Sequence, residues 1–170
     1  LEDSTDLLLY KEIAYQYKQS QNLLRSISFE LTYLEEILQL EHELFPIYSK
    51  VDEGFLSDGT NSHLDIFGEL CRFRQVLDNL FSRHQRDREY KHLQLRYLYL
   101  EGRYFIRSGE YQKGIHDIQK VISYARELKQ SDFLFEGYRQ IIYYCIQTEN
   151  ISEMAYYTDL ALEDAIQANN

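Results

Sequence analysis

The chain has 170 residues, which is enough for one domain with a sizeable core. One proline, seven glycines and abundant Leu, Glu, Gln and Ile favour helix and argue against a protein built from sheets. A net charge of -10 argues against nucleic acid or an anionic membrane as the partner of the whole chain. The sequence has no apolar run long enough to cross a membrane and no signal peptide, so we expect a cytoplasmic protein in which Cys71 and Cys145 are reduced and buried.

The first predicted helical hairpin covers residues 4–40. Apolar residues recur at helical spacing from Asp6 to Gln19, and a second periodic run continues from Asn22, its predicted cap, to about Leu40. Ala14 and Ser26 are the small residues at which the two helices would approach each other.

A second hairpin is predicted for residues 41–83, although its register is not determined by the pattern. Pro46 either starts a helix or kinks one. The stretch from Asp52 to His63 is typical of a loop, and Ser62 is the predicted cap of the helix that follows.

The clearest hairpin lies within residues 86–129. Two helical patterns flank the break at Ser108-Gly109-Glu110. Gly102 and Gly114 each lie inside a predicted helix, where glycine costs about 1 kcal/mol relative to alanine. We therefore expect the two backbones to approach closely at these glycines.

A last hairpin is predicted for residues 131–168. Ser131 is the expected cap of its first helix, and Asn150 with Glu153 forms a capping-box pattern before the second. The apolar residues of that second helix are expected to face inward; they are Ile151, Met154, Leu160, Ala161, Leu162 and Ile166. The chain is thus predicted to contain about four hairpins, or about eight helices, with a period near 40 residues.

The hairpin around Gly102 resembles the tetratricopeptide (TPR) superfamily. Gly102, Phe105, Gly109, Tyr111 and Gly114 match, in order, the family's small and aromatic positions. The chain departs from the pattern at Val121-Ile122 and Arg126, where the family has Ala and later Pro. The resemblance implies a single right-handed, TPR-like α-solenoid over residues 1–170.

The chain is also similar to a narrower group, the TPR-like regulatory domains of Rap, Rgg, NprR, PlcR and PrgX. The similarity lies in the period near 40 residues and in a chain that begins at Leu1 and not at Met. These Gram-positive regulators bind a signalling peptide, and most of them dimerise and carry an upstream DNA-binding helix-turn-helix. The resemblance implies a homodimer. It also allows the chain to be a fragment that lacks an upstream domain. The groove asparagines of the group are scarce here.

Candidate binding residues follow from the resemblance, which places the first helix of each hairpin on a concave surface. Taking Leu98, Tyr138 and Tyr10 as core positions, fixed helical offsets select a basic, tyrosine-rich stripe. Arg and Tyr suit an acidic peptide or a free C-terminal carboxylate. Alternatively, these residues form structural ion pairs and interhelical packing. The predicted groove residues are Lys11, Tyr15, Arg96, Tyr99, Arg103, Arg107, Arg139, Tyr143 and Gln147.

Other kinds of site find little support in the sequence. Residues Arg72 to Lys113 hold ten of the eighteen Lys and Arg, but interspersed acids favour a solvated junction over phosphate binding. The histidines lack metal-ligand spacing, and no nucleophile elbow or phosphate loop is present. We therefore predict no metal, no cofactor and no enzyme activity.

The function predicted from these patterns is a peptide- or protein-binding module. Its most specific form is the ligand-sensing and dimerisation domain of a bacterial cytoplasmic transcriptional regulator. The alternative is a scaffold or adaptor that joins proteins through exposed apolar helices and has no small ligand; the segment around Tyr156, Tyr157 and Leu160 would be such a surface.

Overall fold

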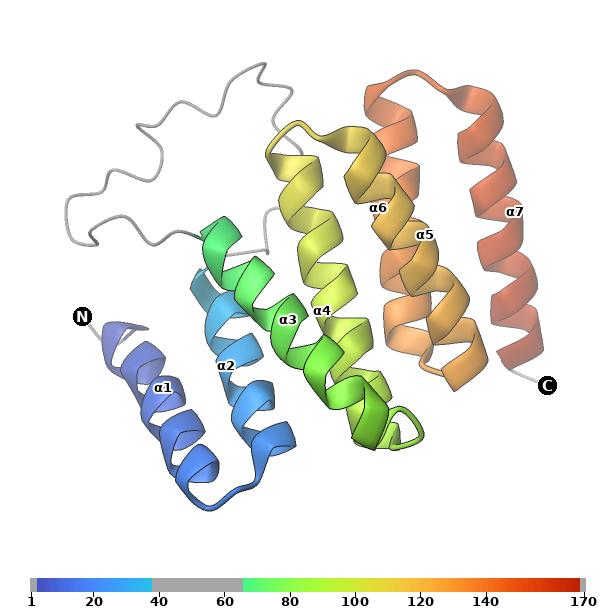
Figure 1. Cartoon of the computed structure of the whole chain (residues 1–170). Helices are drawn as coiled ribbons and strands as arrows, with labels where there is room; N and C mark the ends of the chain where they lie inside the picture. The colour runs from blue at the N-terminus through green and yellow to red at the C-terminus, as the bar shows by residue number, and fades with distance from the viewer. Residues whose placement is uncertain (1–2, 38–65, 169–170) are drawn as a thin grey trace. The chain divides into compact units, whose positions relative to one another are not determined.

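The computed structural model describes residues 3–37 and 66–168, and in these ranges the chain forms α-helices and no strand (Figure 1). This confirms the all-α prediction. None of the described helices is long and apolar enough to cross a membrane. The helices are α1 (Asp3–Gln19), α2 (Leu23–Ile37), α3 (Ile66–His84), α4 (Arg88–Arg107), α5 (Tyr111–Leu128), α6 (Ser131–Gln147) and α7 (Ile151–Ala168).

The chain divides into two compact units, and the boundary falls within α4. The first unit holds α1, α2, α3 and α4 as far as Tyr97, and the second holds α4 from Leu98 together with α5, α6 and α7. The predictions for Pro46, for the loop from Asp52 to His63 and for the Ser62 cap lie outside the described residues.

In the first unit, α1 and α2 form an antiparallel hairpin that meets at two buried small residues. The Ser26 hydroxyl donates to the Ala14 carbonyl at 2.8 Å, and the Asn22 side chain accepts from the Arg25 backbone at 3.3 Å, as its predicted cap role requires. Two buried tyrosines of α4 join that helix to α3 through hydrogen bonds. The Tyr90 hydroxyl donates to the Leu77 carbonyl at 2.9 Å, and the Tyr97 hydroxyl donates to the Leu70 carbonyl at 3.1 Å.

In the second unit, α4 and α5 cross at the two glycines that the sequence singled out. A Cβ atom on Gly114 would lie 2.7 Å from the Gly102 carbonyl oxygen and 2.7 Å from the Ile106 backbone nitrogen. A Cβ atom on Gly102 would lie 3.1 Å from the Gly114 oxygen. The predicted close approach of these two backbones is therefore confirmed.

The remaining helices of the second unit pack in sequence, α5 on α6 and α6 on α7 (Figure 1). Gly137 lets α6 approach Ile122 of α5. Arg126 of α5 donates to both the Asp164 carboxylate, at 2.8 Å, and the Tyr138 hydroxyl, and that hydroxyl in turn donates to Asp164 at 2.6 Å. This network joins three helices, and the Arg126 hydrogen bond holds the pKa of Asp164 below its usual range.

Four of the turns between helices share one geometry. Gln21, Gly109, Lys129 and Glu149 each have positive φ. In each turn, the backbone N–H of the following residue returns to the carbonyl five residues earlier, for example from Glu110 to Phe105 at 2.8 Å. This is the Schellman geometry that ends helices, and glycine is the usual residue at the left-handed position.

Several local predictions were wrong. Ser131 is the first residue of α6, and the cap position belongs to Gln130, which makes no side-chain cap hydrogen bond. Cys71 is exposed, whereas Cys145 is buried as predicted. Leu98 is only half-buried, because the core side of α4 carries Leu93, Leu100 and other residues.

The prediction that the apolar residues of α7 face inward was also wrong for three of them. Ile151, Leu162 and Ile166 are 71%, 60% and 55% exposed, and α7 contains no buried residue.

The predicted Asn150 capping box is present at the start of α7. The Glu153 backbone donates to the Asn150 side-chain oxygen at 3.3 Å, and the Asn150 amide donates to the Glu153 carboxylate at 2.7 Å.

Candidate functional site

Six of the predicted groove residues lie on two helices of the second unit. Tyr99, Arg103 and Arg107 belong to α4, and Arg139, Tyr143 and Gln147 belong to α6. Both neighbouring hairpins are antiparallel, so these stretches of α4 and α6 run in the same direction (Figure 1). The two sets of side chains can therefore match turn by turn.

The first matched level is built around Glu136 of α6. The Tyr99 hydroxyl donates to its Oε2 at 2.9 Å, and an Arg139 nitrogen donates to the same oxygen at 2.5 Å. The Tyr99 ring also meets Phe133 edge-on, with ring centres 5.8 Å apart. Burial is the main cause that raises the pKa of Tyr99 to about 12, so this hydroxyl is a hydrogen-bond donor throughout the physiological range.

Arg103 lies one turn further along α4 and is almost fully enclosed, with 7% of its surface exposed. Its guanidinium carbon is 5.5 Å from the centre of the Tyr99 ring, and its Nε is buried without a hydrogen-bond partner. Burial is the main cause that lowers the pKa of Arg103; the charges of Arg107 and Arg139 act in the same direction, whereas Tyr99 and Glu136 oppose the shift. Arg103 is thus much less exposed than a residue on an open groove would be, and its assignment to a peptide-binding groove stays a prediction.

Gln140 lies one turn further along α6 and is 1% exposed. Both polar atoms of its side chain, Oε1 and Nε2, are buried without a hydrogen-bond partner. The separation between Arg103 and Gln140 is the same 37 residues that separates Tyr99 from its partner Glu136. Helical geometry therefore places these two unsatisfied side chains at one level of the α4–α6 contact.

Sequence reasoning missed Gln140. The chosen offsets from Tyr138 selected Arg139 and Tyr143 and passed over Gln140, which directly follows Arg139. A polar residue in a periodic apolar segment was the available signal. We refer to Tyr99, Arg103, Glu136, Arg139 and Gln140 together as the α4–α6 cluster.

The α4–α6 cluster has the chemistry of a carboxylate-binding site. A guanidinium presents N–H donors in a planar fork, and a carboxamide adds one donor group and one acceptor. Glu136 is already bound by Tyr99 and Arg139, and no described carboxylate lies within ion-pair distance of Arg103. An anion supplied from outside would complete this arrangement.

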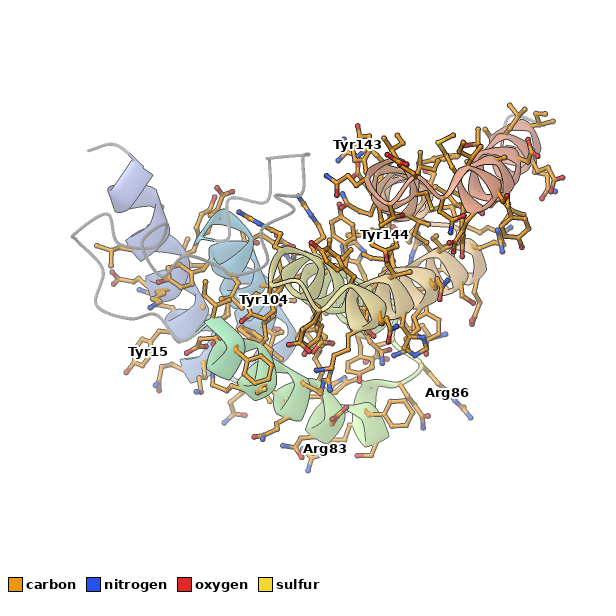
Figure 2. All side chains as sticks on the ribbon, turned by 90° about the horizontal axis from the view of Figure 1, so that it is seen from above. Tyr15, Arg83, Arg86, Tyr104, Tyr143 and Tyr144 are labelled. Atoms are coloured by element: carbon orange, nitrogen blue, oxygen red, sulfur yellow. The ribbon has the colours of Figure 1, made fainter. Side chains whose placement is uncertain are left out.

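The other predicted residues of the second unit are half-buried around the cluster. Burial lowers the pKa of Arg107. Tyr143 and Tyr144 leave α6 on different sides, and Tyr144 is directed toward α5, where it meets the Tyr111 ring at 5.6 Å (Figure 2). Tyr143 thus remains on the side of α6 that is not occupied by α5, and Gln147 lies one turn beyond it.

Arg96 lies in the first unit and is engaged there. Its guanidinium donates to both oxygens of Glu35, at 3.1 and 2.5 Å, and also to Ser28 and Thr32. This arrangement matches the structural ion pair that the sequence left open as an alternative. Lys11 and Tyr15, the remaining predicted residues, line a pocket of the first unit.

The basic residues near the α3–α4 turn do not gather into a phosphate site. Arg83 and Arg86 are exposed and extend away from the helices (Figure 2). His84 contacts Asp87 at 2.7 Å. Within residues 3–37 and 66–168, no group of three or more His, Cys, Asp or Glu side chains could hold a metal ion.

Comparisons of the chain with protein-family models, with curated proteins and with solved structures gave no match.

Proposed function

We propose that this chain is a protein- or peptide-binding helical module that recognises a carboxylate-bearing segment through the α4–α6 cluster. The observation that carries the proposal is the pair of enclosed, unsatisfied side chains, Arg103 and Gln140. An enclosed cation that forms no ion pair is costly, and a half-satisfied polar cluster is worse than an apolar one. A bound carboxylate would remove this cost.

The proposal includes a right-handed, TPR-like solenoid. Support comes from the second unit, where α4 contacts α6 through Tyr99 and α5 contacts α7 through Arg126 and Gln119. In a helical solenoid, equivalent helices of successive hairpins lie side by side in this way. The starts of α5 and α7, Tyr111 and Ile151, also preserve the period near 40 residues.

The biological role that we propose is ligand sensing and dimerisation in a bacterial cytoplasmic regulator. This role rests on the resemblance to the Rap, Rgg, NprR, PlcR and PrgX group. A peptide that occupies the groove residues, Arg103, Arg107 and Arg139 among them, would favour one arrangement of the helices over another. Such a population shift would change the contacts made by an attached output domain.

The test compares two pools of short peptides that differ only at the C-terminus, one with free carboxylates and one amidated. Peptides retained by the chain are identified by mass spectrometry. We expect retention from the carboxylate pool, and we expect the retained peptide to raise the melting temperature. Equal retention from both pools would contradict carboxylate recognition.

The variant Arg103→Gln, with exposed Arg83→Gln as its matched control, assigns binding to the cluster. Arg103→Gln should fold with unchanged helical circular dichroism and lose at least tenfold in affinity, because a charged hydrogen bond contributes about 1.5–3 kcal/mol. Arg83→Gln should bind like the parent chain. If Arg103→Gln retained its affinity, the assignment of binding to the α4–α6 cluster would be wrong.

The second candidate function is a scaffold that assembles proteins through α7. It is favoured by the exposed Ile151, Leu162 and Ile166, which follow one face of that helix. The test is sedimentation of the parent chain and of an Ile151→Ser, Leu162→Ser, Ile166→Ser variant. Self-association that disappears in the variant, in a chain that retains no peptide, would favour the scaffold.

A further inference from the structure

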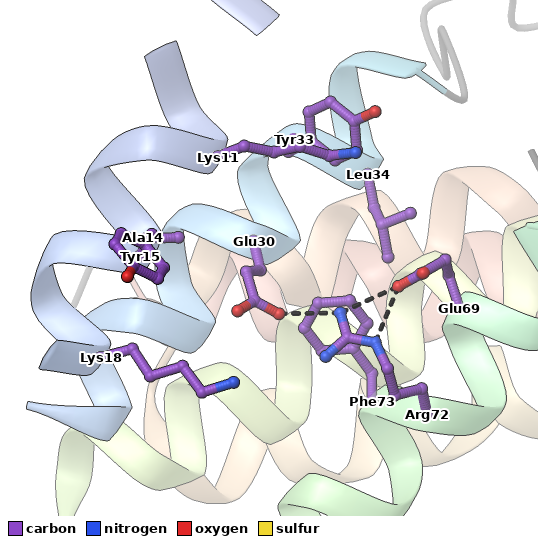
Figure 3. A pocket seen from close by; sticks show the side chains of 10 residues that line it. All are labelled: Lys11, Ala14, Tyr15, Lys18, Glu30, Tyr33, Leu34, Glu69, Arg72 and Phe73. Atoms are coloured by element: carbon purple, nitrogen blue, oxygen red, sulfur yellow. Dashed lines mark hydrogen bonds and ion pairs between the residues drawn. The ribbon is translucent and has the colours of Figure 1, made fainter. Parts of the chain in front are cut away.

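The first unit contains a pocket formed by α1, α2 and α3, with a volume of about 310 Å³ (Figure 3). This volume is at the lower end of the range for small-molecule sites, about 300–1,000 Å³. All of its walls belong to the same unit. The lining residues are Lys11, Ala14, Tyr15, Lys18, Glu30, Tyr33, Leu34, Glu69, Arg72 and Phe73.

Both acidic side chains of the pocket are paired with Arg72. Its Nη2 donates to Glu30 at 2.8 Å and its Nε donates to Glu69 at 2.9 Å (Figure 3). The guanidinium also lies over the Phe73 ring, 4.6 Å from its centre. Arg72 therefore joins α2 to α3 and forms a fixed part of the wall.

Two lysines of α1, Lys11 and Lys18, outweigh the one negative charge that remains after Arg72 is paired with Glu30 and Glu69. The Lys11 ammonium lies over the Tyr33 ring, 4.3 Å from its centre. Lys18, seven residues further along α1, makes no ion pair within the described part of the chain and extends along the pocket toward the Glu30–Arg72 pair (Figure 3). Three cations against two carboxylates leave one net positive charge.

The rest of the lining is apolar or aromatic. Ala14 and Leu34 are buried, the Phe73 ring is buried beneath Arg72, and Tyr15 stands 62% exposed at the side of the pocket. The accessible apolar surface is therefore that of Tyr15 and of the half-buried Tyr33, and two aromatic rings suit a flat or branched apolar group. Because Glu30 and Glu69 also line the pocket, a singly charged anion fits it better than a dianion such as phosphate.

We propose that this pocket binds a monocarboxylate with an aromatic or branched apolar body, with the carboxylate at Lys18 and the apolar body against the rings of Tyr15 and Tyr33. The ligand is either a free small acid or the C-terminal residue of a peptide, which share this chemistry. The site is separate from the α4–α6 cluster, and the inference does not rest on the function proposed for that cluster.

The experiment uses N-acetyl-L-phenylalanine as the probe and its C-terminal amide as the matched neutral ligand. Binding is followed in ¹H–¹⁵N spectra of the full chain. We expect the carboxylate to shift amide signals of residues 11–18 and 69–73, in α1 and α3. The neutral amide should bind at least tenfold more weakly.

Lys18→Met tests the proposed carboxylate partner, and Lys113→Met is the control, because it removes the same charge at an exposed site in the second unit. Lys18→Met should weaken binding about tenfold, as expected for the loss of one charged hydrogen bond. Lys113→Met should leave it unchanged. Absence of shifts at 10 mM probe, equal binding of acid and amide, or equal loss in both variants would overturn the proposal.

Two further experiments distinguish a peptide terminus from a free acid as the ligand, and the pocket from the α4–α6 cluster as the binding site. Tighter binding of N-acetyl-Gly-Gly-Phe than of the single residue supports a peptide terminus, and equal binding supports a free acid. Arg103→Gln should leave the α1 and α3 shifts intact. If those shifts disappear in Arg103→Gln while Lys18→Met retains them, the probe binds the α4–α6 cluster and the pocket proposal is wrong.

Discussion

The two units solve the same packing problem in different ways. In the first, α1 and α2 approach at Ala14 and Ser26, and the Ser26 hydroxyl adds a hydrogen bond to the facing backbone. In the second, α4 and α5 approach at Gly102 and Gly114, where neither helix has a side chain. The first contact is supported by a side-chain bond, whereas the second depends on the absence of side chains.

This difference predicts unequal sensitivity to substitution. A crossing that leaves no space for a Cβ atom must move its backbones if one is added, and tightly packed interiors resist such movement. A crossing that already accommodates Cβ atoms loses only the bond that a substitution removes. The second unit should therefore be the more fragile at its helix crossing.

The largest effect is expected for Gly114→Ala. The new Cβ would meet the Gly102 oxygen and the Ile106 nitrogen at 2.7 Å, and both are backbone atoms that cannot rotate away. After the gain in helix propensity of about 1 kcal/mol, we expect a net loss of about 2–3 kcal/mol in the free energy of unfolding. Urea denaturation followed by circular dichroism measures it.

Gly102→Ala is the matched control for this substitution. Its Cβ would lie 3.0 Å from the flexible end of Ile118 and 3.1 Å from the Gly114 oxygen, so small adjustments suffice. We expect a change of less than about 1 kcal/mol. A larger loss at Gly102 than at Gly114 would contradict the description of this crossing.

An intermediate effect is expected for Asp164→Asn, which removes the charged tie of the second unit. The Asp164 side chain is 12% exposed and accepts from Arg126 and Tyr138. We expect a loss of about 1–2 kcal/mol at neutral pH, reduced from the value for buried charges because Arg126 is half-exposed. Asp159→Asn, at an exposed position of the same helix, should change stability by less than about 0.5 kcal/mol.

The pH dependence sharpens this prediction. The hydrogen bond from Arg126 lowers the pKa of Asp164 in the folded chain, so the carboxylate contributes stability above the unfolded pKa near 3.8. That contribution is lost as pH falls through the lower folded pKa. The difference in unfolding free energy between the parent chain and Asp164→Asn should therefore shrink below about pH 4, and a constant difference down to pH 2 would refute the linkage.

The smallest effect is expected for Ser26→Ala in the first unit. The substitution removes the 2.8 Å hydrogen bond to Ala14 but leaves the Cβ atom and the helix spacing in place. We expect a loss of about 1 kcal/mol. Ser123→Ala, at an exposed position of α5, is the control. If Ser26→Ala cost more than Gly114→Ala, the contrast between the two crossings would be wrong.

Sequence reasoning located the elements that depend on local chemistry. Periodic apolar positions predicted the helices, and Gly102 with Gly114 predicted a close crossing because glycine inside a helix needs a reason. The Asn22 and Asn150 caps were also predictable, since an asparagine before an apolar periodic run has a defined hydrogen-bonding role.

The errors arose where a residue's role depends on how many neighbours surround its helix. In α4, apolar residues occur on most sides, and buried positions include Leu93, Leu95 and Leu100, so one core stripe could not be selected from spacing alone. That is why Leu98 was chosen as a core position, although it is only half-buried, and why the enclosure of Arg103 was not predicted. In α7 the error has the opposite sign: its apolar pattern predicts burial, but none of its residues is buried.

The candidate site could be predicted only in part. The offsets selected residues of α4 and α6 that do lie together, Tyr99, Arg103 and Arg139. They could not show that Glu136 is shared by Tyr99 and Arg139 or that Gln140 is unsatisfied. Those facts depend on the pairing between helices, which a single sequence does not specify.

The repeated Schellman turns have a consequence for redesign. Gln21, Lys129 and Glu149 occupy the left-handed position that Gly109 occupies in the turn between α4 and α5, and a residue with a Cβ atom costs about 1 kcal/mol there. Glycine at those three positions would relieve that cost. Because the four joints share one geometry, they also form natural splice points at which helices could be exchanged or hairpins duplicated to build longer arrays.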